Sequence, residues 1–433
     1  MAGNLRKLGG EQPLLRMTFS LYVLGCKING YEGEALQEEL LLSGFRKAEE
    51  GESPDYYFLL TCAVTNQSER KDSKSLHEIH KRYPDARIVV LGCSSQIHKE
   101  RYLSYSGVKA VYGTANRHLI VDNLKKEERD FVLPNPRLFD YDPLKISSGQ
   151  KETRTTLKIQ DGCDNFCTYC LIPYSRGRSR SRRREEILSE SLRLLESGVK
   201  ELVVSGIDVG SYQDPEREDY RLSDLLLDLA VLPFQGPYRL RVSSIELSQI
   251  DEKYLAAYQE YPDRIVPHFH IPLQSGSEKI LKKMNRKYDL SRFLSVVQEI
   301  HGLFPNAGLS TDVIAGFPGE TEEDFQETCS FLKEAGFMRI HAFPYSERPG
   351  TMASGIKDGI VPYPERRRRV KELIALSEEQ EALFRKSLDG KKVTVLWDSR
   401  KDNVLKGYSE NYLSYERKGD KEEVGTFSSF ISH

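Results

Sequence analysis

The sequence lacks any long hydrophobic run. Nowhere in its 433 residues do about 18 uninterrupted apolar residues occur. The N-terminal stretch does not combine a basic segment with a long apolar one. These absences argue against a membrane span and against secretion, so we expect a protein of the cytoplasm with no membrane partner.

Cysteine is scarce and odd in number. Seven cysteines in a chain of this length argue against a disulfide framework and favour reduced thiols that act as ligands or nucleophiles. The length itself exceeds the size at which a single core stops growing, so two or three domains are expected.

A large excess of either charge is also missing, because the formal net charge is only −2. The charges are nevertheless segregated. A first run holds Arg176, Arg178, Arg180, Arg182, Arg183 and Arg184, and a second run holds Arg366 to Arg369. Such runs predict a surface for a polyanion that the net charge conceals.

The first part of the chain, residues 17–145, has the pattern of a small parallel domain of the α/β class. Helix-like segments at Glu34 to Leu42 and Gln67 to Arg82 separate strand-like runs. The expected strands are Phe19 to Leu24, Tyr56 to Leu60, Ile88 to Leu91 and Lys109 to Tyr112.

A polar linker around Pro134 to Lys151 precedes a longer alternating region, residues 146–388, which ends in a charged helix at Glu365 to Leu388. Six strand-helix units predict a partial (β/α)6 barrel with functional loops at the C-terminal strand ends. The expected strands are 157–160, 201–205, 240–243, 268–271, 309–315 and 339–343.

The last segment, residues 389–433, has short strand patterns at Lys391 to Trp397, Lys406 to Ser409 and Tyr412 to Glu416. These predict a small β-barrel. It is short, and no clear closing strand is expected before its end.

Directly after the first expected barrel strand lie Cys163, Cys167 and Cys170, in a C-x-x-x-C-x-x-C loop. Three thiolates can hold a 4Fe-4S cluster and leave one iron open, where S-adenosylmethionine (SAM) can bind and be cleaved to a radical. Structural zinc is the alternative, but it requires four ligands, and no fourth Cys or His follows at the usual spacing.

This loop resembles the signature of the radical SAM superfamily, which implies that the three cysteines are catalytic. Three further cysteines, Cys26, Cys62 and Cys93, each follow an expected strand. Because parallel strands deliver their C-terminal ends to one edge, these thiols can meet. Simple packing of each cysteine is the alternative, and it is the favoured role for Cys329.

Three such cysteines followed by the radical SAM loop resemble the methylthiotransferase family. That resemblance implies a second 4Fe-4S cluster on Cys26, Cys62 and Cys93. It also implies a SAM pocket on loops of small residues, comprising Ser205, Gly206, Asp208, Arg241, Ser243, Gln274, Ser275, Gly276 and Gly316.

The substrate is expected to be RNA. Arg176, Arg178 and Arg180 follow the cysteine loop closely and are candidates for phosphate contacts, with a solvated charged face as the alternative. The C-terminal segment resembles the TRAM domain, and its aromatics, such as Tyr408 and Tyr412, suit stacking on unpaired bases.

Within the family, Cys26-Lys27-Ile28-Asn29 and the arginine run resemble the branch that modifies N6-threonylcarbamoyladenosine at tRNA position 37. Methylthiolation of isopentenyladenosine or of a ribosomal-protein aspartate, and an iron-sulfur RNA-binding module without turnover, are the alternatives. The enzyme would need a low-potential electron donor such as flavodoxin or ferredoxin, and its sulfur source is open.

Overall fold

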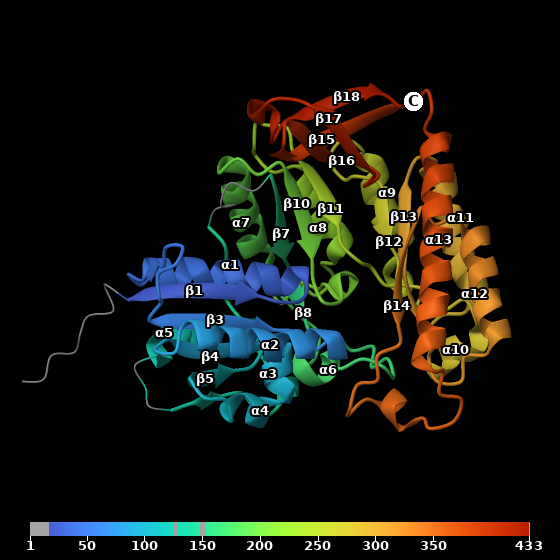
Figure 1. Cartoon of the computed structure of the whole chain (residues 1–433). Coiled ribbons are helices and arrows are strands. Elements are labelled where there is room, and N and C mark those ends of the chain that lie inside the picture. Colours follow the sequence, from blue (N-terminus) through green and yellow to red (C-terminus); the bar gives the residue numbers. More distant parts are fainter. Residues whose placement is uncertain (1–16, 125, 127, 148–152, 433) are drawn as a thin grey trace, which may run out of the picture. The chain divides into compact units, whose positions relative to one another are not determined.

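The computed structural model describes residues 17–124, 126, 128–147 and 153–432. The chain divides into two compact units (Figure 1). The first comprises Met1–Ala63, Gln67–Pro134 and Asp142–Leu144, and the second comprises Val64–Asn66, Asn135–Tyr141 and Lys145–His433. No helix in the described ranges is long and apolar enough to cross a membrane.

The first unit is built on a six-stranded parallel sheet with the order β2-β1-β3-β4-β5-β6. All four strands expected from the sequence are present. The strands are β1 (Thr18–Val23), β2 (Arg46–Lys47), β3 (Tyr56–Thr61), β4 (Arg87–Gly92), β5 (Val108–Tyr112) and β6 (Asp130–Phe131).

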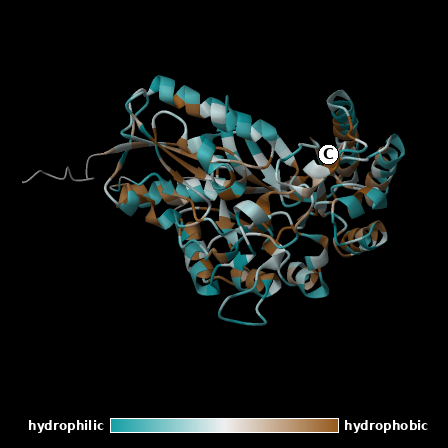
Figure 2. Cartoon of the chain, turned by 90° about the horizontal axis from the view of Figure 1, so that it is seen from below, coloured by the Kyte–Doolittle hydropathy of each residue, from teal (hydrophilic) through white to brown (hydrophobic). Residues whose placement is uncertain are grey.

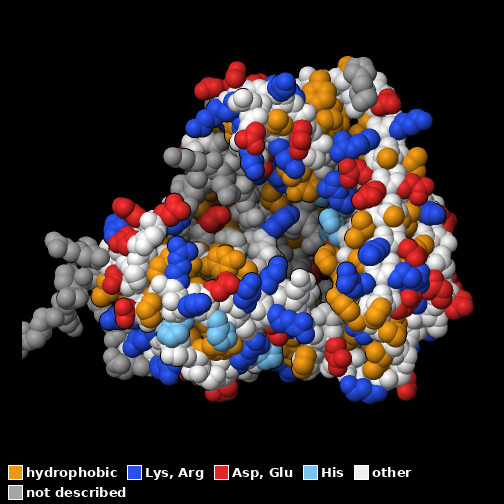
Figure 3. Space-filling model, viewed as in Figure 1, with side chains coloured by type: hydrophobic (Ala, Val, Ile, Leu, Met, Phe, Trp, Pro, Cys, Tyr) orange, Lys and Arg blue, Asp and Glu red, His pale blue; other side chains and the backbone are white. Residues whose placement is uncertain are grey.

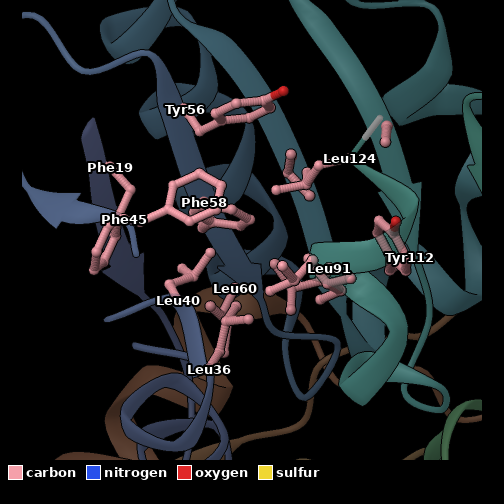
Figure 4. Packing of buried hydrophobic residues seen from close by; sticks show 14 residues of the cluster. Phe19, Leu36, Leu40, Phe45, Tyr56, Phe58, Leu60, Leu91, Tyr112 and Leu124 are labelled. Carbon is pink, nitrogen blue, oxygen red and sulfur yellow. The ribbon is translucent and has the colours of Figure 1, made fainter. Parts of the chain in front are cut away.

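Helices cover both faces of this sheet. On one face Leu36 and Leu40 of α1 (Lys27–Leu42) pack with Phe19, Phe58 and Leu60 of the strands (Figure 4). On the other face, α2 (Asn66–Arg82) and α4 (Lys99–Leu103) pack on alternate strand residues. The two short helices α3 (Cys93–Ile97) and α5 (Ile120–Asn123) complete the unit.

The second unit contains the partial barrel. Two three-stranded parallel sheets, β11-β10-β7 and β12-β13-β14, are linked by a bridge between Ser244 and His270. The strands are β7 (Arg154–Lys158), β10 (Glu201–Ser205), β11 (Arg239–Val242), β12 (His268–His270), β13 (Gly308–Ala315) and β14 (Arg339–Pro344). The expected open barrel of six strands is therefore confirmed.

The barrel is covered by helices whose apolar sides face the strands and whose polar sides are teal in Figure 2. The last of them, α13 (Tyr363–Ser387), is the long charged helix expected at 365–388. The others are α7 (Arg184–Glu196), α8 (Leu222–Ala230), α9 (Glu252–Glu260), α10 (Glu278–Lys283), α11 (Leu290–Leu303) and α12 (Glu322–Ala335).

The C-terminal segment forms an antiparallel sheet with the order β17-β16-β15-β18. A last strand, which the sequence pattern did not reveal, is present at β18 (Phe427–Ile431) and pairs with β15. Among the described residues β17 and β18 remain edge strands, so the sheet is a half-barrel. The other strands are β15 (Lys392–Lys401), β16 (Val404–Ser409) and β17 (Ser414–Lys418).

Candidate functional site

The loop that carries Cys163, Cys167 and Cys170 begins after β8 (Gln160–Asp161), at the C-terminal end of the first barrel strand. Gly162 opens it with a φ of +74°, and a Cβ there would lie 1.9 Å from the carbonyl oxygen of Arg178. Only glycine fits this close approach of two backbones. The loop ends in α6 (Ile172–Ser175).

Each of the three sulfurs receives a hydrogen bond. Asn165 donates its backbone N–H and its Nδ2 to Cys163 Sγ, at 3.5 and 3.4 Å. The backbone N–H of Ile172 lies 3.4 Å from Cys170 Sγ. Donors of this kind stabilise a thiolate sulfur and tune a cluster bound to it.

A segment far along the chain holds the cysteine loop and supplies the third donor. Arg286 Nη1 lies 3.3 Å from Cys167 Sγ, and the same guanidinium pairs with Glu246. Asn285, in a left-handed conformation with a φ of 61°, donates Nδ2 to the carbonyl of Phe166 at 3.0 Å. Neither residue was predicted from the sequence, although an asparagine just after a helix, next to a basic residue, signals such a turn.

The donor set fits a 4Fe-4S cluster. The three thiols lie on one loop, and each has a polar hydrogen-bond donor. In the described part of the chain, no three Cys, His, Asp or Glu side chains form a group that could hold a single metal ion.

Asp208, a predicted SAM contact, is the acidic neighbour of this loop. Its Oδ2 lies 3.8 Å from Cys163 Sγ, and Gln249 donates to its Oδ1 at 2.8 Å. Burial raises the pKa of Asp208. Burial, with the charge of Asp208, also raises the pKa of the Cys163 thiol.

Two other predicted residues lie at the end of β10 and on the loop that follows it. A Cβ at Gly206 would approach Gln160 Oε1 to 2.7 Å, and Gln160 Oε1 also accepts the backbone N–H of Asp208 at 2.8 Å. Ser205 is buried at the end of β10, where its hydroxyl donates to the carbonyl of Val203. The structure therefore brings Ser205, Gly206 and Asp208 to the side of the cysteine loop.

The predicted loops after β12 and β13 are held by α12 and α13. Gln274 has a φ of 68° and donates its N–H to the carbonyl of Asp312 at 2.8 Å. Ser275 and Gly276 are buried against Thr328 of α12, whose Oγ1 accepts the Gly276 N–H at 2.9 Å. In the structure, Ser275 and Gly276 therefore make their contacts with α12.

Gly316 begins the next turn with a φ of +75° and donates its N–H to Glu320 Oε2 at 2.6 Å. Glu320 is bound in turn by Arg369 Nη1 at 2.6 Å. Part of the second arginine run is thereby assigned to fixing this turn.

Arg241 lies in β11 and Ser243 directly follows that strand, and their side chains have different surroundings. The Ser243 hydroxyl is buried and has no hydrogen-bond partner among the described residues. Arg241 is not brought to the cysteine loop. Its guanidinium binds Glu201, the first residue of β10, and donates to the carbonyls of Ser409 and Glu410 at 3.1 and 3.0 Å.

Arg241 instead joins the barrel to the C-terminal sheet. It lies over the ring of Tyr412 at 4.4 Å from the centroid, and Arg154 donates Nη2 to the Tyr412 hydroxyl at 3.1 Å. The charges of Arg241, Arg239 and Arg154 hold the pKa of buried Glu201 well below its usual range. Tyr412, expected to stack on bases, is half-buried in this contact.

The three predicted phosphate-binding arginines take different positions. Arg176 is fully buried and binds Asp161 at 3.1 Å, and Arg180, 10% exposed, binds the same carboxylate at 3.3 Å. Arg178 is 51% exposed and pairs with Asp164 at 2.8 Å. The structure corrects the expectation for Arg176 and Arg180, because their side chains are committed to a buried carboxylate.

In the first unit, Cys26, Cys62 and Cys93 lie at the C-terminal ends of three neighbouring strands. Cys62 directly follows β3, Cys93 directly follows β4, and Cys26 precedes α1 after β1. A Cβ on Gly25 would lie 3.0 Å from Cys62 Sγ, so the loops after β1 and β3 are in contact. The edge expected from the sequence is formed.

Buried polar groups fix this edge. Asn29 Nδ2 donates to the carbonyls of Leu24 and Thr61, at 2.7 and 2.9 Å, and so ties the end of β1 to that of β3. Asp72 of α2 accepts the backbone N–H of Cys62 at 3.2 Å. Burial raises the pKa of Asp72 to about 7.

Comparison with known proteins shows which families and folds this chain resembles. The family described as "Radical SAM superfamily" matches residues 157–332, and "Uncharacterized protein family UPF0004" matches residues 18–113. Among solved structures, the fold is similar to the radical SAM methyltransferase TsrM from Kitasatospora setae. The TM-score is 0.59 at 13% identity, covering 76% of this chain and 74% of that one. The barrel with its three-cysteine loop thus defines a radical SAM enzyme.

Curated relatives narrow this class. The chain is 35% identical to "Threonylcarbamoyladenosine tRNA methylthiotransferase MtaB" of Bacillus subtilis, over 94% of this chain and 92% of the relative. It is 35% identical to the protein of that name from Thermotoga maritima, over 95% and 93%. The chain belongs to the radical SAM methylthiotransferases, sulfur-transferring enzymes that use SAM and 4Fe-4S clusters.

Proposed function

We propose that the protein adds a methylthio group to carbon 2 of N6-threonylcarbamoyladenosine at position 37 of tRNA. One observation carries the proposal. The chain matches relatives named for this nucleoside over nearly the full length of both chains. The two cysteine groups at strand ends, which the reaction needs, support it.

The proposal divides the work between the two cysteine groups. Cys163, Cys167 and Cys170 would hold the cluster that, with SAM, supplies the 5′-deoxyadenosyl radical. Cys26, Cys62 and Cys93 would hold the second cluster, which serves sulfur insertion. A hydrogen on an aromatic carbon offers no acid-base handle near neutral pH, so a cofactor-derived radical is the suitable reagent.

The surrounding residues would bind SAM and orient the cysteine ligands. Asp208 and Ser243 carry the polar atoms best placed for SAM, because one lies beside Cys163 and the other has a buried hydroxyl without a partner among the described residues. Ser205, Gly206, Gln274 and Gly316 shape the loops. Arg286 keeps Cys167 oriented and adds positive charge beside the cluster.

We assign these tasks to three segments: residues 17–145 for the second cluster, 146–388 for radical chemistry and 389–433 as a TRAM-like RNA-binding part. The partners are tRNA and a low-potential electron donor such as flavodoxin or ferredoxin. The reaction belongs in the cytoplasm, where tRNA is found.

The test is nucleoside mass spectrometry of tRNA from a strain that lacks the gene. Loss of the methylthio form of threonylcarbamoyladenosine, with accumulation of the unmodified precursor, supports the proposal. Wild-type protein should restore the product and the Cys163→Ala variant should not. Unchanged levels of this nucleoside in the deletion strain would refute the assignment.

A second candidate substrate follows from other relatives. The chain is 33% identical to "tRNA-2-methylthio-N(6)-dimethylallyladenosine synthase" of Bacillus subtilis, over 94% of this chain and 82% of the relative. The same mass spectra decide between the two substrates, because in that case the dimethylallyl nucleoside would lose its methylthio group instead.

A further inference from the structure

The outer side of α2 carries a row of cations. At about 100° per residue, Arg70, Lys74 and Lys81 lie on one line, with Lys71 and Arg82 beside it. All five side chains are exposed. The opposite side of the helix is buried and carries Asp72, Leu76 and Ile79. We call these five cations the α2 stripe.

The α2 stripe is poorly neutralised. Among the described residues Lys74 pairs with Glu78 at 3.6 Å, and no ion pair is found for the other four cations. Glu69, in the first turn, is directed to His98 at 3.2 Å instead. Exposed pairs such as Lys74–Glu78 are worth little and exchange readily for another anion.

The first arginine run behaves differently, which makes the contrast informative. Arg176 and Arg180 share Asp161, Arg182 pairs with Glu190 at 2.7 Å, and Arg184 pairs with Asp228 at 2.5 Å. These four cations are paired with carboxylates that are buried or half-buried, whereas Arg178 and Arg183 make exposed pairs with Asp164 and Glu216. Figure 3 shows Lys and Arg side chains over the region that α2 occupies in Figure 1.

We propose that the α2 stripe binds the phosphate backbone of the RNA substrate. At about 1.5 Å of rise per residue, Arg70 and Arg82 are separated by roughly 18 Å along the helix. That length corresponds to about five nucleotides of one strand, at roughly 3.4 Å of helix axis each. Lysine and arginine in a line suit a regular series of phosphates and carry no base specificity.

The start of α2 lies close to Cys62, one of the proposed cluster ligands. The helix begins four residues after Cys62, and Asp72 on its buried side accepts the Cys62 N–H. A strand of RNA that follows the stripe toward the start of the helix is led to the edge that carries Cys26, Cys62 and Cys93. The inference rests on the proposed function and assigns part of the substrate contact to the first unit.

An acidic electron-donor protein could also use a basic face. RNA is favoured because the straight row of charges suits a backbone of evenly spaced phosphates better than a compact protein patch.

The experiment compares two triple variants of the full-length, cluster-reconstituted protein. The first, Arg70→Gln, Lys74→Gln and Lys81→Gln, removes the line of the stripe. The control, Lys333→Gln, Lys371→Gln and Lys386→Gln, removes the same charge from exposed lysines of α12 and α13. Binding of a tRNA anticodon stem-loop is measured from about 50 to about 300 mM salt, because the logarithm of the affinity falls over such a range in proportion to the number of phosphate contacts.

The stripe variant should bind on the order of tenfold more weakly or worse, and the slope of log K against log salt should fall by about 0.7 to 0.9 for each lost contact. The control should match wild type, and 5′-deoxyadenosine formation without substrate should be unchanged in both. Wild-type affinity and slope in the stripe variant would overturn the inference and leave the tRNA assignment intact.

The experiment also distinguishes two further outcomes from these. If the wild-type protein itself fails to bind the stem-loop, the proposed function fails together with the inference. If the stripe variant binds RNA normally but is reduced more slowly by flavodoxin, the stripe is a docking site for the electron donor, and the RNA contact is wrong.

Discussion

Arg176 and Asp161 form a buried ion pair beneath the cysteine loop, with Nη1 3.1 Å from Oδ1 and 3.2 Å from Oδ2. Lys158 binds the same carboxylate at 2.7 Å. Three cations surround one anion, since Arg180 also reaches it, and their charges hold the pKa of Asp161 well below its usual range. Arg176 and Arg180 of the basic segment therefore bind the carboxylate that directly precedes the cysteine loop.

Arg176→Gln should therefore destabilise the fold, because it removes one partner of a fully buried pair. We expect a loss of about 3 to 5 kcal/mol in the free energy of unfolding. Arg178→Gln, which breaks an exposed pair, should cost less than about 1 kcal/mol. Denaturant unfolding under anaerobic conditions measures both, and equal effects would contradict the burial difference.

The same cluster sets an acid dependence. A carboxyl whose folded pKa is lowered contributes stability above its unfolded pKa, about 3.9 for Asp, and loses that contribution as the pH falls toward the folded pKa. The gap in Tm between wild type and Asp161→Asn should thus be full at pH 6 to 7 and should narrow below about pH 4. A gap independent of pH would show that Asp161 has the same pKa in the folded and unfolded protein, and hence that its ion pairs do not lower it.

Iron content tests the ligand assignment. Two 4Fe-4S clusters give about eight irons per reconstituted chain. The triple Ala variant of Cys163, Cys167 and Cys170 should keep about half of them and lose SAM cleavage. Cys62→Ala should spare 5′-deoxyadenosine formation while ending methylthio transfer, and Cys329→Ala should change neither. A Cys163 triple variant with full iron would refute the assignment.

Arg286 should tune the barrel cluster through its contact with Cys167. Removing a positive charge and a hydrogen bond from the sulfur makes reduction harder, so Arg286→Gln should lower the reduction potential by on the order of tens of millivolts. An EPR-monitored redox titration measures this shift. Lys287→Gln, at the exposed neighbouring residue, is the control, and equal shifts in both variants would exclude a specific role.

Ser243→Ala tests whether the unpartnered hydroxyl faces SAM. Because no hydrogen bond within the described protein is lost, the Tm should change little. Loss of one neutral hydrogen bond to a ligand costs about 0.5 to 1.5 kcal/mol, which is roughly a two- to tenfold rise in the Kd for SAM. Ser205→Ala, whose hydroxyl has a partner in Val203, is the comparison. An unchanged Kd would remove Ser243 from the pocket.

The sequence by itself determined the positions of the six proposed ligands. Cys163, Cys167 and Cys170 are close because only a few residues separate them. The strand-end cysteines follow from alternation of strands and helices, since parallel strands end at a common edge. The two α/β regions were predictable for the same reason, because hydrophobic periodicity is local.

Only the tertiary structure decided which charged groups are functional candidates. Arg241 binds Glu201 and the C-terminal sheet, and Arg176 binds Asp161, so neither remains available for a substrate. The sequence shows a charge but not its partner, and burial is decided by whether folding brings a carboxylate close enough to offset desolvation. The cations of α2 stay outside because their helix turns its only buried acid, Asp72, toward Cys62.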